Sequence, residues 1–164
     1  MNKYLLLLAT IVITLSSFTT ESAYTIDKLM ESIETQVDKE VKVRGKINHV
    51  CRHSGKKCFI VNEQGDLSMQ IMAGGDIETF DKELVGSEIE AVGIVKERRI
   101  EKEQIDKNEQ DAKDKMQNEE SEESHKHCNA MLNNVKQMRE WMEKNNKEYY
   151  AIYYIEGLKY EVVK

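Results

Sequence analysis

Two segments of the chain share a pattern that restricts them to bent β-strands. Apolar and charged residues alternate over 41–47 around Gly45, and again over 88–99 around Gly93. This alternation is typical of a half-buried strand, and a glycine inside such a strand marks a bend, a bulge or a close approach of backbones. We therefore expect two long strands that each curve at their glycine.

Three further strands are expected from the same kind of pattern. Two short ones fall at 58–61 and 67–71, and the tyrosine-rich C-terminus, YYAIYYIEGLKYEVV, supplies the last. Apolar residues at helical spacing predict a short helix over 25–37 and another over 76–86. Three strands, a short helix, a strand with a central glycine and a final strand follow the order of an OB-fold barrel.

The sequence therefore predicts a mainly β protein with helices, a five-stranded OB-fold barrel that begins with an N-terminal helix. A long helical insertion, 101–147, separates strands four and five; it has no glycine or proline and is densely charged. Its second half has an apolar stripe at helical spacing, which predicts a helix packed on the barrel: Cys128, Met131, Leu132, Val135, Met138 and Met142. Whether the insertion forms one helix or two is left open.

The first 23 residues have the pattern of a secretory signal peptide. Lys3 precedes an apolar stretch too short to span a bilayer comfortably, and small residues follow it. An N-terminal membrane anchor is the alternative. We expect a mature chain, 24–164, that forms a single domain without a membrane span in the periplasm or cell envelope.

Charge and motifs narrow the class of function. The net charge of −6 argues against general nucleic-acid binding, because such proteins gain affinity by neutralising phosphates. A Ser-His-Asp order, a nucleotide-binding loop and a paired-carboxylate motif do not rise above chance in the sequence. A non-enzymatic binding protein is therefore expected.

The stretch HVCRHSGKKC, 49–58, holds the most distinctive chemistry. If Ser54-Gly55 is a two-residue hairpin turn, Cys51 lies opposite Cys58, and His53 shares their face because side chains alternate along a strand. Four interpretations stay open. These are two buried structural thiols, a Cys51–Cys58 disulfide, a metal site and a catalytic thiol.

The metal interpretation names a donor set and a metal class. Thiolate and imidazole donors suit zinc or copper. The set joins the hairpin to the start of the predicted long helix: Cys51, His53, Cys58, His127 and Cys128. The same hairpin offers residues for contact with an anionic ligand: His49, Arg52, Lys56 and Lys57.

The string His-Val-Cys-x-His-x-Gly, present here from His49 to Gly55, together with the strand pattern, resembles a group of small exported OB-fold proteins of Bacteroidetes-type bacteria. The resemblance covers about 25–99 and 148–163. It implies an OB barrel in the cell envelope and carries over no catalytic residues. We expect an exported OB-fold binding protein that presents the Cys/His hairpin to an unknown ligand or envelope protein. Transition-metal binding or thiol-redox chemistry is the alternative.

Overall fold

The computed structural model describes residues 22–119 and 121–163. The expected signal peptide therefore lies almost wholly outside the described residues. The elements in chain order are β1 Tyr24–Thr25, α1 Ile26–Gln36, β2 Glu40–Val50, β3 Lys57–Val61, β4 Ser68–Ala73, η1 Lys82–Leu84, β5 Glu88–Glu101, α2 Lys102–Asn118, α3 Glu122–Lys144 and β6 Tyr149–Val162.

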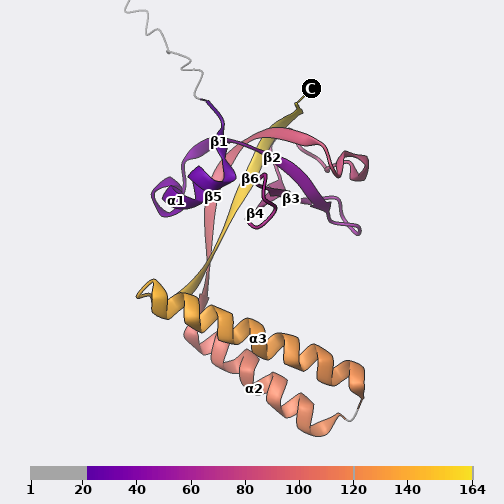
Figure 1. Cartoon of the computed structure of the whole chain (residues 1–164), viewed down its shortest axis with the longest axis vertical. Helices are drawn as coiled ribbons and strands as arrows, with labels where there is room; N and C mark the ends of the chain where they lie inside the picture. The colour runs from indigo at the N-terminus through magenta and orange to yellow at the C-terminus, as the bar shows by residue number, and fades with distance from the viewer. Residues whose placement is uncertain (1–21, 120, 164) are drawn as a thin grey trace, which may run out of the picture.

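Five of the strands close into a barrel (Figure 1). The sheet order is β1-β2-β3-β4-β6-β5, and an additional pairing of β2 with β5 closes it. β4 and β6 run parallel, and the other pairs of the barrel are antiparallel. The prediction of a five-stranded OB-fold-like barrel is therefore confirmed. The short strand β1, which the sequence pattern did not indicate, pairs parallel with Val43 and Arg44 of β2.

Both mid-strand glycines lie where another part of the chain comes too close for a side chain. A Cβ on Gly45 would lie 2.8 Å from the Ile26 side chain and 3.1 Å from the Val61 carbonyl oxygen. A Cβ on Gly93 would meet the Glu156 carbonyl oxygen and lie 2.9 Å from Gly157 Cα. Gly93 also marks the register shift between β5 and β6. These glycines therefore permit close packing of strands.

Helix α1 contributes its apolar face to the barrel core. Ile26, Leu29 and Ile33 are buried in that core. The helix begins at Thr25, whose hydroxyl oxygen accepts a hydrogen bond from Lys28 N at 3.4 Å. Asp27 lies in the first turn, where a carboxylate complements the helix dipole.

The segment between β4 and β5 differs from the helix predicted over 76–86. The structure has only the 3₁₀ turn η1 there. Ile77 and Phe80 are buried, as their spacing suggested, but backbone N–H groups of this segment bond to acceptors in β6 and in the loop between β2 and β3. Asp76 N donates to the Leu158 carbonyl and Phe80 N to the Gly55 carbonyl, both at 2.8 Å. Those bonds replace the i to i−4 bonds of a helix.

The insertion forms two helices at the end of a long β-ribbon. β5 and β6 pair from Ile89 with Val162 as far as Glu101 with Tyr149. Figure 1 shows the antiparallel hairpin of α2 and α3 extending away from the barrel beyond this ribbon. Ser121 caps α3, its Oγ accepting from Ser124 N at 3.2 Å.

The helices have a small core of their own. Ile105, Val135 and Met142 are buried together against Ile100 and Trp141. The expectation that the long helix packs on the barrel is wrong for most of its length, because its apolar stripe is covered by α2 and by the base of the ribbon. Over the described part of the chain, none of the helices is long and apolar enough to cross a membrane.

Gly93→Ala should destabilise the protein by ~2 kcal/mol, because the new methyl would meet the backbone of β6. Gly45→Ala should cost less, since its nearest neighbour is the movable end of the Ile26 side chain. Urea unfolding of the two variants and the unchanged protein measures both effects. Equal midpoints for all three would contradict this account of the glycines.

The barrel should fold without α2 and α3. Glu101 and Tyr149 are cross-strand partners, so deleting 102–148 and joining them through Asn-Gly makes a two-residue hairpin loop. The variant should retain a cooperative thermal transition and a β-type circular dichroism spectrum, because the buried barrel core draws none of its residues from either helix. Loss of the cooperative transition would show that the helical hairpin is required for folding.

Candidate functional site: the first hairpin

A β-bulge in β2 decides which side chains of the first hairpin face the core. Register shifts between Ile47 and His49, so that Val50 pairs with Cys58 and His49 with Phe59. Asn48 and His49 are consecutive exposed residues, and Val50 is buried. The predicted pairing of Cys51 with Cys58 is therefore wrong by one residue, and a shift of one residue moves a side chain to the other face.

The loop that joins β2 to β3 is also longer than the predicted two-residue turn. It spans 51–56 and is closed by a hydrogen bond of 2.9 Å from Gly55 N to the Cys51 carbonyl. Gly55 has a φ of +64°, a conformation that suits a residue without Cβ. Two further bonds fix the loop, from Phe80 N to the Gly55 carbonyl and from Ala73 N to the Lys56 carbonyl.

The cysteines of the hairpin lie in different environments. Cys58 is completely buried in the barrel core, and burial raises the pKa of its thiol to about 12. Cys51 is half-buried at the start of the loop. All three cysteines of the chain are free thiols, so the structure does not have the Cys51–Cys58 disulfide. Cys58 matches the interpretation of a buried structural thiol.

Cys51 is surrounded by hydrogen-bond donors. Backbone N–H groups of Ser54 and then His53 lower the pKa of its thiol, with smaller contributions from the Ser54 hydroxyl and from the charge of Lys57. The Ser54 Oγ lies 3.7 Å from the sulfur. Converging backbone N–H groups favour the charged form of an acid. The backbone of the turn therefore favours the thiolate form of Cys51.

Within the part of the chain that the structure describes, the cations of the hairpin form no ion pairs. Between Ile47 and Asn62 the chain has no acidic residue. Arg52, Lys56 and Lys57 are exposed. Throughout residues 22–119 and 121–163, the ion pairs involve other basic residues, among them Lys42 with Glu90 and Arg44 with Glu88. The hairpin is thus a local positive patch on an acidic protein.

The residues predicted as metal ligands are not brought together. His53 is exposed on the loop and Cys58 is in the barrel core. His127 and Cys128 lie on α3, where Cys128 is completely buried. The described residues hold no group of three or more His, Cys, Asp or Glu side chains arranged to bind a metal ion. The physical reason is that the β5–β6 ribbon carries α3 away from the first hairpin.

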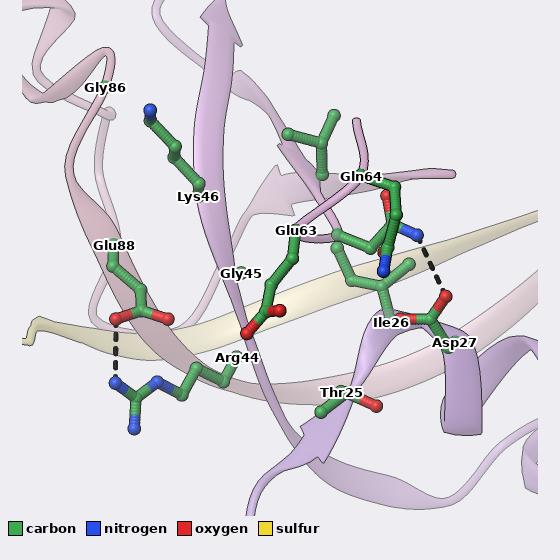
Figure 2. A pocket seen from close by; sticks show the side chains of 12 residues that line it. Thr25, Ile26, Asp27, Arg44, Gly45, Lys46, Glu63, Gln64, Gly86 and Glu88 are labelled. Carbon is green, nitrogen blue, oxygen red and sulfur yellow. Dashed lines mark hydrogen bonds and ion pairs between the residues drawn. The ribbon is translucent and has the colours of Figure 1, made fainter. Parts of the chain in front are cut away.

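A hollow lies beside the middle of β2, and the sequence did not indicate it. Its volume is about 870 Å³, and Figure 2 shows its polar lining. Arg44 is held by Glu88 at 2.7 Å, and the buried Asn62 donates to Asp27 and Asp66 at 2.9 and 2.8 Å. The Asn62 carbonyl oxygen accepts from Gly65 N and Leu67 N, which fixes the turn after β3. These groups are thus occupied with one another.

Comparison with known proteins provides little on function. No protein-family model matches the chain, and no curated protein matches it. Among solved structures, the chain is similar to a protein assigned as an aspartyl-tRNA synthetase from Leishmania major Friedlin, with 24% identity and a TM-score of 0.34. The match covers 57% of this chain and 19% of that protein, so this chain spans only a small part of its length.

Proposed function

We propose that the chain is an exported, non-enzymatic OB-fold binding protein, and that its first hairpin contacts an anionic group on a ligand or envelope protein. The observation that carries the proposal is the exposed positive patch of Arg52, Lys56 and Lys57, which forms no ion pair among the residues described. Cations that a protein leaves unpaired on one ordered hairpin are available to a partner, whereas Lys42 and Arg44 of β2 are held by Glu90 and Glu88.

The place of the hairpin in the barrel supports the same proposal. In OB folds the loop between the first two strands is one of the loops that contact ligands. Here the loop is held in place by Phe80, which packs against Tyr160 with ring centroids 5.4 Å apart and donates its backbone N–H to the Gly55 carbonyl. An ordered loop loses less entropy when it binds than a mobile loop does.

The family resemblance and the apolar N-terminal stretch support export to the cell envelope. His49 and His53 add two exposed imidazoles to the patch, which can donate hydrogen bonds to a ligand.

Neutralising the patch should weaken anion binding by about tenfold at low salt. The test variant is Arg52→Gln/Lys56→Gln/Lys57→Gln, and the probe is inorganic tripolyphosphate in isothermal titration calorimetry. The matched control is Lys107→Gln/Lys126→Gln/Lys144→Gln, which removes the same net charge from exposed lysines of the helical hairpin. Equal weakening by both triple variants would show that net charge, and not the first hairpin, governs binding.

A second candidate function, thiol chemistry at Cys51, is favoured by the N–H groups that converge on its sulfur. A thiolate is the nucleophile in thiol–disulfide exchange, so a lowered pKa and partial exposure increase the reactive fraction near neutral pH. In such an exchange the Cys51 sulfur would bond to one sulfur of a partner disulfide, and the other sulfur would leave as a thiolate.

The reagent DTNB, an aromatic disulfide, should label one thiol quickly in the folded protein and three after unfolding. Because the pKa of Cys51 is lowered, labelling should already be fast at pH values where an ordinary thiol reacts slowly. Ser54→Ala should shift the pH–rate profile upward by removing one donor to the sulfur, while Ser32→Ala should not. Fast labelling that survives Cys51→Ser would rule out Cys51 as the reactive thiol.

A further inference from the structure

A groove lies between α1 and the C-terminal end of α3, away from the first hairpin. Its volume is about 610 Å³. Met30 and Ile33 line it from α1, and Trp141 from α3. Residues 150–153 of β6 and the first residues of β4 complete the lining. The groove therefore contains part of a β-strand as well as side chains.

The part of β6 in this groove is a free sheet edge. β4 pairs with β6 only from Tyr154 to Gly157. From Tyr149 to Tyr153, within the described chain, β6 pairs with β5 alone. Alternate N–H and C=O groups on the other side of this segment consequently lack a strand partner, and an exposed edge of this kind can accept an additional strand.

We propose that the groove binds an extended peptide segment, which adds as a strand beside β6 in line with β4. Strand addition to an exposed edge obtains affinity from main-chain hydrogen bonds and specificity from pockets for alternate side chains. The edge lies in a groove lined by α1 and α3, so a single extended chain fits there. In a second copy of this chain, α1 and α3 flank the same edge of β6. These helices would keep the β6 edges of two copies apart.

The lining defines the side chains that the segment should carry. Trp141 and Tyr150 form an edge-to-face pair with ring centroids 5.2 Å apart, and Met30 is half-buried beside the barrel core. These groups suit aliphatic side chains on one face of the bound strand.

The rim of the groove is acidic. Glu34 is already bound to Lys147 at 2.6 Å, but the exposed Glu31 belongs to none of the ion pairs formed by the described residues. A lysine or arginine on the partner would pair with Glu31. The partner is therefore an extended basic segment in which aliphatic and basic residues alternate.

This site is independent of the proposed function at the first hairpin. β2 and β4 both pair antiparallel with β3, which starts directly after the loop 51–56, so both run toward the end of the barrel that carries this loop. The groove lies at the beginning of β4, which is the opposite end. Loss of anion binding at the hairpin would leave peptide binding in the groove unchanged, and the reverse also holds.

The test uses a capped hexapeptide, acetyl-Lys-Val-Lys-Leu-Lys-Val-amide, and the full chain. Trp141 is the single tryptophan of the protein, so its fluorescence reports occupancy of the groove directly. We expect a saturable change in emission, together with at least tenfold slower hydrogen exchange at some amides of 149–153. No change in either signal at millimolar peptide would overturn the proposal.

Two N-methylated isomers of the peptide test the strand geometry. In a strand, the N–H groups of alternate residues point to the same edge. Methylation of residues 2 and 4 therefore blocks one edge, and methylation of residues 3 and 5 blocks the other. We expect one isomer to lose binding at least tenfold and the other to bind almost as well as the parent peptide. Equal affinities for both isomers would exclude strand addition.

A matched pair of charge reversals tests the acidic rim. Glu31→Lys should weaken binding of the hexapeptide at least fivefold, because it places a cation opposite the basic residues of the peptide. Glu103→Lys changes the net charge equally at an exposed position on α2 and should leave the affinity unchanged. If both variants weakened peptide binding equally, net charge alone would explain the effect, and the proposed role of the rim would be overturned.

Discussion

The pairing of β2 along both of its edges is the constraint on which the rest of the structure depends. Residues Glu40–Lys46 bind β5, and Lys46–Val50 bind β3. The two pairings meet at Lys46, directly after Gly45, so this part of β2 joins β5 to β3 and closes the barrel. Gly45 also leaves space for the Ile26 side chain, so the closure of the barrel and the insertion of α1 into its core meet at this glycine.

The bulge near Asn48 links this closure to the chemistry of the first hairpin. Up to Ile47 the buried residues of β2 alternate regularly, and after it Val50 takes the inward position. Cys51 is thereby moved to the rim, where Ser54 and His53 offer it backbone N–H groups. Without the extra residue, Cys51 would face the core beside Cys58. One extra residue in β2 therefore places Cys58 in the core and Cys51 among hydrogen-bond donors at the rim, where the pKa of its thiol is lowered.

The sequence predicted the strands better than the details of their pairing. Alternation of apolar residues is a local property, so the five strands and the separation of the insertion from the barrel were predictable. A bulge leaves no comparable local signal, since Asn48 and His49 are ordinary polar strand residues. The buried residues Ile77 and Phe80 had helical spacing, yet the acceptors of their segment's N–H groups, Gly55 and Leu158, are remote in the sequence.

The groove at β6 illustrates a different limit of sequence reasoning. Its aromatic residues were visible in the sequence as a tyrosine-rich strand. What exposes the edge is the short length of β4, which reaches only Tyr154 along a strand that extends to Tyr149. The β5–β6 ribbon extends beyond the barrel to the helical hairpin, and β4 does not extend with it. The part of β6 beyond β4 therefore has an unpaired edge. Trp141 of the helical hairpin lines the groove beside this edge. The edge therefore suits a narrow, extended chain and not the edge of a whole sheet.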